Sequence, residues 1–201
     1  MSDSSTESGE TALYEPIMRD LRTVIGGWYL EKEKKYIPQS RPNEFEENPR
    51  LEITAFRKIS PTLQKEFDDE TFLALGLVGK YPDIMGFVRR KASVRRELIT
   101  VEVKNQPIKL MDIFQAQLYQ VLFKARLGFL ISPKGITEKI VRFITSSNYR
   151  FIRENVIILQ YNKDHRNSTL GAHVGTFECN PKLRDVVPES LRKYFEAYDK
   201  K

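Results

Sequence analysis

Apolar residues near the N-terminus recur at the three- and four-residue steps of one helix face, which predicts an amphipathic helix over residues 16–29. The face is made by Ile17, Leu21, Val24, Ile25 and Trp28. Pro16 is expected in the first turn, where its missing N–H does no harm. Residues 31–49 are charged and contain three prolines, and they are expected to form an irregular excursion over the surface.

The middle of the chain favours strands. Residues 51–55 alternate apolar with polar, and a helix start is indicated at Ser60-Pro61, but residues 62–78 fit a helix and a strand equally well. Two β-type runs, residues 83–88 and 98–104, flank a basic polar turn. A long helix is then expected over residues 108–125. Its predicted apolar face consists of Met111, Phe114, Leu118, Leu122 and Ala125.

The remaining pattern predicts a strand at 128–131, a helix at 136–144, a strand at 155–159, an edge strand at 173–177 and a closing helix at 188–198. Strands that alternate with helices in this order indicate a mixed α/β fold. With 201 residues the chain suits one well-buried core. We therefore expect one domain over residues 11–201, preceded by a disordered polar tail at 1–10 that lacks the apolar region of a signal peptide.

The two β-type runs can pair as a hairpin. If its turn is centred between Ala92 and Ser93, Asp83 lies directly opposite Glu102. The period of two then divides the second strand into two faces. One face carries Thr100, Glu102 and Lys104, and the other carries Ile99, Val101 and Val103. The second face is expected to pack against helices.

Two carboxylates opposite each other in a sheet repel, and a cation between them would remove that conflict. Mg²⁺ prefers oxygen ligands and often takes one or two carboxylates together with water. Asp83 and Glu102 therefore look like half of a metal site. The alternative is that the Glu102–Lys104 motif is simply solvated on an exposed strand face.

These residues resemble the signature of the PD-(D/E)xK nuclease superfamily. Pro82-Asp83 is followed by Glu102-Val103-Lys104 on the next strand, and Gln115 with Tyr119 on the following helix is similar to the Q-x-x-x-Y motif of the RecB-like branch. The resemblance covers residues 82–131, with a weaker match in the first helix. It implies a restriction-endonuclease-like core, a central mixed sheet flanked by helices in α-β-β-β-α-β order.

The resemblance also implies roles for residues. Asp83 and Glu102 hold Mg²⁺, for which Mn²⁺ can substitute, and Lys104 activates or positions the attacking water. A further glutamate comes from the first helix, and either Glu10 or Glu15 can supply it. Both can equally be N-terminal charges favoured by the helix dipole.

Gln115 and Tyr119 lie one helical turn apart and face the same way. The resemblance places them along the cleft. The alternative is that they border the apolar face of the helix.

The turn of the hairpin carries five cations within eight positions: Arg89, Arg90, Lys91, Arg95 and Arg96. With a net charge of +6, they suit contact with DNA phosphates beside the carboxylate pair. A solvated turn whose charges discourage edge-to-edge pairing is the alternative.

The expected function is therefore that of a metal-dependent deoxyribonuclease that hydrolyses phosphodiester bonds. The alternatives are a catalytically idle DNA-binding protein of the same fold, a partner subunit in a DNA-processing complex, and a basic interaction domain with an accidental motif match. The sequence contains no motif of the kind that binds the phosphates of a nucleotide. Any helicase or recombination partner is therefore expected to be a separate protein. Many members of the superfamily are homodimers, but no self-association signal is visible.

The single cysteine, Cys179, excludes an iron–sulfur cluster held by this chain and favours a reducing, cytoplasmic location. Membrane association is not expected, because no apolar run is long enough to span a bilayer. His165 and His173 lie outside any metal-ligand spacing and are interpreted as incidental polar residues.

Overall fold

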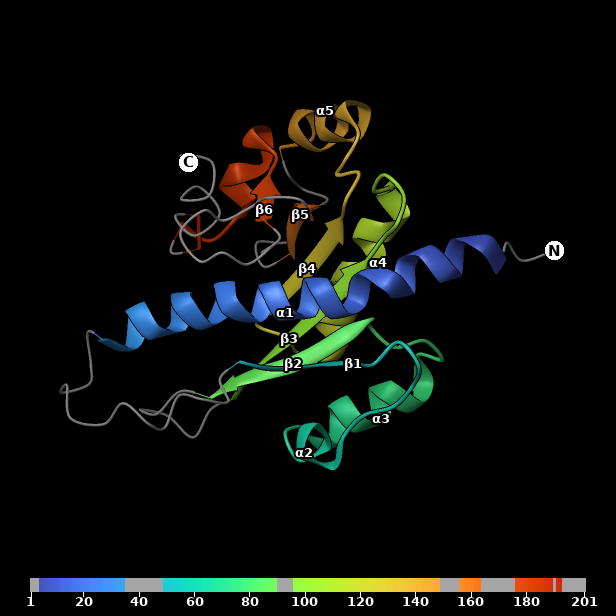
Figure 1. Cartoon of the computed structure of the whole chain (residues 1–201), viewed down its shortest axis with the longest axis vertical. Helices are drawn as coiled ribbons and strands as arrows, with labels where there is room; N and C mark the ends of the chain where they lie inside the picture. Colours follow the sequence, from blue (N-terminus) through green and yellow to red (C-terminus); the bar gives the residue numbers. More distant parts are fainter. Residues whose placement is uncertain are drawn as a thin grey trace.

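The computed structural model describes residues 4–34, 49–89, 96–148, 156–163, 176–189 and 191–192. All strands in these ranges join one mixed sheet whose spatial order follows the sequence (Figure 1). The strands are β1 (Arg50–Ile53), β2 (Ile84–Arg89), β3 (Arg96–Val103), β4 (Leu127–Ser132), β5 (Val156–Asn162) and β6 (Thr176–Cys179). The predicted α/β class is confirmed.

Three neighbouring pairs, β1–β2, β2–β3 and β5–β6, are antiparallel, whereas β3–β4 and β4–β5 are parallel. Parallel neighbours need a crossover connection, usually a helix. Here α4 (Leu110–Leu122) connects β3 to β4, and α5 (Glu138–Ser146) lies between β4 and β5 in the sequence. The helices predicted at 108–125 and 136–144 are thus confirmed.

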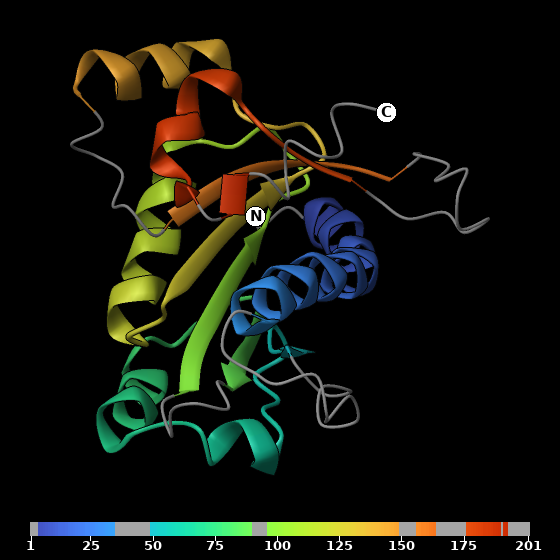
Figure 2. The same ribbon diagram turned by 90° about the vertical axis from the view of Figure 1, so that its left-hand side faces the viewer.

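Helices cover both faces of the sheet. Figure 2 shows α1 (Ser4–Lys34) on one face and α4 on the other. The buried face of α1 contains the residues that the periodicity singled out, from Ile17 to Trp28, and it packs on Ile99, Val101 and Val103. The expected packing face of the second hairpin strand is therefore confirmed.

The hairpin register is also as predicted. Ile84 pairs with Val101 and Met85 with Thr100, which is the register expected for a turn centred between residues 92 and 93. Gly86 sits where β1 comes closest, because a Cβ atom there would lie 2.0 Å from the backbone oxygen of Arg50. A side chain at position 86 would push β1 away from the sheet.

The start of α1 differs from the prediction. The helix begins at Ser4, so residues 4–10 are its first turns and not a tail, and Pro16 lies inside the helix instead of in its first turn. An internal proline costs about 3 kcal/mol in a helix. Upstream contacts oppose that cost: Gly9 packs on Asn105, and Tyr14 bonds to Asp83.

The ambiguous stretch at 62–78 is helical. Ser60 caps α2 (Pro61–Gln64), as the predicted helix start requires, and Asp68 caps α3 (Asp69–Leu77) through the backbone N–H of Thr71. Apolar side chains lie on the outer side of α3 as well as the inner side, and Phe72, Leu73 and Leu77 are exposed. Because apolar residues lie on both sides of the helix, the sequence shows no helical periodicity of apolar and polar positions here.

The face of α4 was predicted wrongly. Most of the expected apolar face points to solvent, with Met111 71% and Leu118 50% exposed. The helix instead buries Ile113, Ala116, Tyr119 and Gln120. Both stripes are rich in apolar residues, so helical period alone could not choose between them.

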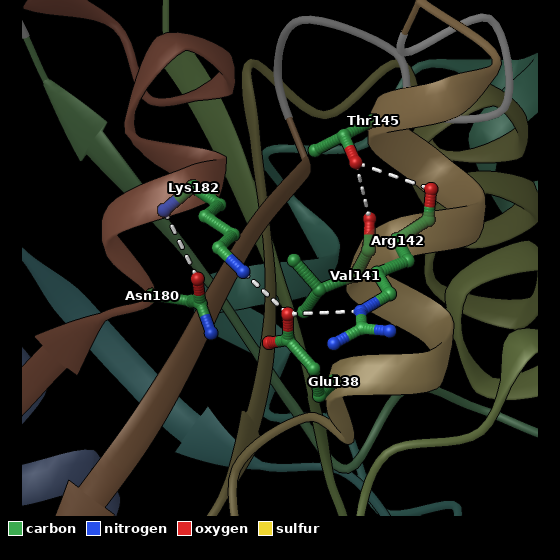
Figure 3. A network of polar contacts seen from close by, with 6 residues as sticks. All are labelled: Glu138, Val141, Arg142, Thr145, Asn180 and Lys182. Carbon is green, nitrogen blue, oxygen red and sulfur yellow. Dashed lines mark hydrogen bonds and ion pairs between the residues drawn. The ribbon is translucent and has the colours of Figure 1, made fainter.

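The C-terminal region packs beside α5. The 3₁₀ helix η2 (Pro181–Val186) follows β6, the expected edge strand. The carboxylate of Glu138 accepts hydrogen bonds from Lys182 Nζ and, at 3.4 Å, from Arg142 Nε (Figure 3). Of the closing helix predicted over 188–198, only a turn up to Arg192 lies in the described residues. No helix in the part of the chain that the structure describes is long and apolar enough to cross a membrane.

Candidate functional site

Asp83 and Glu102 come together at one end of the hairpin. Asp83 directly precedes β2, and Glu102 is the penultimate residue of β3, so the hairpin register sets them opposite each other. Both side chains are buried, with Asp83 5% and Glu102 2% exposed. The backbone oxygen of Asp83 accepts hydrogen bonds from Thr54 N at 2.8 Å and Ala55 N at 3.1 Å, which fixes this end of β2 against the turn after β1.

The Asp83 carboxylate is oriented by two elements. Its Oδ1 accepts a hydrogen bond of 3.0 Å from the hydroxyl of Tyr14 on α1, and its Oδ2 accepts one of 2.7 Å from the backbone N–H of Val103 on β3. The side chain therefore has a defined orientation.

The Glu102 carboxylate is only half satisfied. Its Oε1 accepts a hydrogen bond of 2.6 Å from Lys104 Nζ, whereas its Oε2 is buried and has no hydrogen-bond partner among the described residues. A buried carboxylate oxygen without a partner is energetically unfavourable. A cation or a bound water would relieve it.

The carboxylates influence one another electrostatically. Burial raises the pKa of Glu102, and the neighbouring charge of Asp83 raises it further, in spite of the ion pair with Lys104. Burial also raises the pKa of Asp83, against the opposing effect of its bond from Val103 N–H. The site therefore resists holding two negative charges without a compensating cation.

Lys104 remains an ammonium group in this arrangement. Burial opposes its charge, but the attraction of Glu102, Glu10 and Asp83 outweighs burial and raises the pKa of Lys104. Its side chain is 15% exposed, so the ammonium reaches the edge of the site. An ammonium group can supply a fixed positive charge, whereas a base would need the neutral amine.

The two N-terminal glutamates have different surroundings. Glu10 is half-buried and accepts a hydrogen bond from the backbone N–H of Asn105. Burial raises the pKa of Glu10. The charge of Lys104 opposes this shift, and the charge of Asp83 adds to it. Glu15 is exposed. Only Glu10 is thus brought to the carboxylate pair.

Gln115 and Tyr119 lie against the same site from α4. Gln115 Nε2 donates to the Tyr119 hydroxyl at 3.1 Å. Burial and the nearby carboxylates of Glu102 and Asp83 raise the pKa of Tyr119 to about 12, although the bond from Gln115 opposes the shift. Tyr119 is therefore close enough to the carboxylates to be affected by their charge, and it also belongs to the core.

Of the five cations predicted to contact DNA phosphates, Arg89 and Arg96 lie in the described residues. Arg89 pairs with Arg96 at the other end of the hairpin from Asp83. Six residues of strand span about 20 Å, so the backbones of Arg89 and Arg96 lie well away from the carboxylates. Arg90, Lys91 and Arg95 lie outside the described residues, and so do His165 and His173. Cys179 is half-buried on β6, where its thiol donates to the backbone oxygen of Asn180.

Two residues near the carboxylates were missed from the sequence. Tyr14 was recognisable in principle, because it lies one helical turn after Glu10 and so shares its face. Lys80 acts on Glu10, Asp83 and Glu102 through its charge, from the loop before β2. No sequence signal marked Lys80.

The site fits a divalent ion that keeps most of its water. Among the described residues no group of three or more His, Cys, Asp or Glu side chains is arranged to hold a metal. Two carboxylates match the one or two protein ligands that Mg²⁺ commonly takes, and one of them has an oxygen with no partner in the described part of the chain. Comparisons with known protein families, with curated proteins and with solved structures find no match to this chain.

Proposed function

We propose that the protein is a metal-dependent deoxyribonuclease of the PD-(D/E)xK superfamily. The observation that carries the proposal is the buried pair Asp83–Glu102. One Glu102 oxygen has no partner among the described residues, and Lys104 Nζ lies 2.6 Å from the other. The order α1, β1, β2, β3, α4, β4 supports a restriction-endonuclease-like core, with α2 and α3 inserted after β1.

Asp83 and Glu102 are the residues that would hold Mg²⁺ or Mn²⁺, with Glu10 at the side of the pair. When bound, such an ion supplies a polarised phosphate and a more acidic water. Tyr14 and the backbone of Val103 keep the Asp83 carboxylate in position. The burial of both carboxylates lowers the local dielectric and strengthens every charge interaction there.

Lys104 brings positive charge to the place where a phosphodiester gains negative charge. Its close ion pair with Glu102 favours the ammonium form over a free amine. Gln115 and Tyr119 border the site from α4, where the amide oxygen of Gln115 can accept a hydrogen bond from substrate or bound water.

A DNA-binding protein without turnover is the second candidate. The observation in its favour is the same ion pair, because Lys104 Nζ neutralises one Glu102 oxygen without any metal. In that case metal ions neither bind nor alter DNA retention.

The test incubates the purified chain with supercoiled plasmid, linear duplex and single-stranded DNA, in Mg²⁺, Mn²⁺ or EDTA. Asp83→Asn is the test variant, and Asp69→Asn on exposed α3 is its matched control. Metal-dependent cutting that is lost only in Asp83→Asn supports the nuclease. DNA retention that needs no metal and is accompanied by no cutting supports the second candidate.

A further inference from the structure

A cavity of about 640 Å³ lies between the end of β1, the turn after it and the helices α2 and α3. Its size falls in the range of small-ligand sites. The side chains that give it chemical character are Glu52, Arg57, Lys58, Gln64, Phe72 and Tyr81. Two cations, Arg57 and Lys58, and two aromatic rings, Phe72 and Tyr81, therefore line the same cavity.

The cavity begins near the backbone of Asp83, at the end of β1 and the turn after it. Ala55 N donates to the backbone oxygen of Asp83 at 3.1 Å, and Arg57 follows only two positions later. Between them the exposed ring of Phe56 packs edge-on against Tyr14, with ring centroids 6.3 Å apart. Tyr14 in turn bonds to Asp83. Ile53 also lines the cavity, and the N–H of its neighbour Thr54 donates to the same backbone oxygen of Asp83 at 2.8 Å, so the cavity begins close to the Asp83 backbone.

The wall of the cavity is fixed by hydrogen bonds. Arg57 Nη2 donates to the backbone oxygen of Gly79, Gln64 Nε2 donates to that of Ile59 at 3.1 Å, and Glu52 Oε1 accepts from Ser60 N at 2.7 Å. These bonds leave the Gln64 amide oxygen and other guanidinium N–H groups of Arg57 available for a ligand.

Aromatic rings and cations in one groove match the chemistry of an unpaired nucleotide. Bases stack on exposed aromatic side chains with about 1–3 kcal/mol each, and basic groups follow the phosphates. Phe72 lines the cavity and is 59% exposed, so its ring presents surface to a ligand. A base inside a duplex is already stacked and paired, and it can enter such a cavity only after it leaves the helix.

We propose that this cavity holds an unpaired nucleotide of the DNA strand that occupies the carboxylate site, so that the substrate is single-stranded DNA or a duplex with an unpaired end. The inference rests on the proposed nuclease function and adds its substrate class. Stacking on Phe72 gives the preference over intact duplex, and Lys58 adds a phosphate contact.

The test measures the affinity of the full chain for a fluorescein-labelled oligo(dT) 20-mer and a 20-base-pair duplex in EDTA, by fluorescence anisotropy. The variants are Phe72→Ala and Lys58→Glu. Their matched controls on α5 are Phe143→Ala, another exposed phenylalanine, and Lys139→Glu, another exposed lysine. We expect Phe72→Ala to weaken single-strand binding by about 5-fold to 100-fold, with duplex binding unchanged.

Three results overturn the inference: wild-type affinity for the duplex that equals or exceeds that for the single strand, no loss in Phe72→Ala, or an equal loss in Phe143→Ala. Melting curves of each variant separate lost binding from lost folding. Cleavage is scored separately with Mg²⁺. Selective single-strand binding without cutting keeps the cavity and rejects the nuclease, whereas cutting with unaltered binding in Phe72→Ala does the opposite.

Discussion

The hydroxyl of Tyr14 donates a 3.0 Å hydrogen bond to the carboxylate of Asp83, which lies 69 positions later in the chain. This bond ties α1 to the end of the hairpin where the carboxylates meet. The part of α1 before Pro16, which the sequence pattern did not include in a helix, thus holds the Asp83 carboxylate in position.

Tyr14→Phe is expected to lower metal-dependent cutting by about tenfold or more, because Asp83 loses one of its two orienting bonds. The matched control is Tyr161→Phe, since the Tyr161 hydroxyl donates to the buried carboxylate of Asp20 at 2.8 Å on the same helix. In each variant the free energy of unfolding, measured with urea, should fall by about 1–2 kcal/mol. Equal loss of cutting in both variants would contradict a specific role for Tyr14.

Glu102→Gln is expected to remove the stabilisation of the protein by metal. In the wild type, Mg²⁺ or Mn²⁺ at 100 times its dissociation constant should add about 2.7 kcal/mol to the free energy of unfolding. The physical reason is that the ion satisfies the Glu102 oxygen for which the described residues offer no partner, and that it relieves repulsion with Asp83. Melting curves with and without metal measure the effect. A similar shift in the variant would place the ion elsewhere.

The structure of the β2–β3 hairpin could be predicted from local sequence patterns. Its register and the division of β3 into a helix-packed face and a carboxylate face follow from alternation, because a slip by one residue would exchange the two faces. The α1 core residues, the N-cap Ser60 and the positions of the strands were readable for similar local reasons.

The errors share a different cause. On α4 both Leu118 and Ile113 belong to apolar stripes, and only the packing of the sheet decides that Ile113 is buried. The choice between Glu10 and Glu15 likewise depends on how α1 crosses β3, and Gly9 against Asn105 permits that approach. Such choices depend on contacts between distant segments, which a single helix pattern does not contain.

Glu10→Gln is expected to weaken Mn²⁺ binding by about tenfold, because its carboxylate adds negative charge beside Asp83 and Lys104. Glu15→Gln is the matched control from the same helix, and it should bind Mn²⁺ as the wild type does, since Glu15 is exposed. Calorimetric titration of both variants gives the affinities. A loss confined to Glu15→Gln would reverse the assignment.

Lys104→Met is expected to separate metal binding from turnover. Removing the ammonium frees the Glu102 oxygen that it contacts, so metal affinity should stay the same or increase. Cutting should fall by about 10²–10³-fold, as when one donor to a developing negative charge is lost. Single-turnover cleavage and metal titration are compared on the same preparation. Retained cutting in Lys104→Met would exclude the proposed role of this lysine.

Asp68 provides a pH prediction away from the carboxylate site. The hydrogen bond from Lys124 Nζ, together with that from the Thr71 N–H at the start of α3, lowers the pKa of Asp68 below its ordinary value of 3.8. A lowered carboxyl pKa means that the stabilisation is complete above pH 3.8 and is lost as the pH falls below it.

Asp68→Ala should therefore cost about 1 kcal/mol at pH 7, chiefly through the lost helix cap, because the ion pair with Lys124 is half exposed and screened. The difference in the free energy of unfolding between variant and wild type should shrink as Asp68 becomes protonated in strong acid. Urea unfolding at pH 7 and at successively lower pH measures both. A difference that grows toward low pH would contradict the assigned direction of the pKa shift.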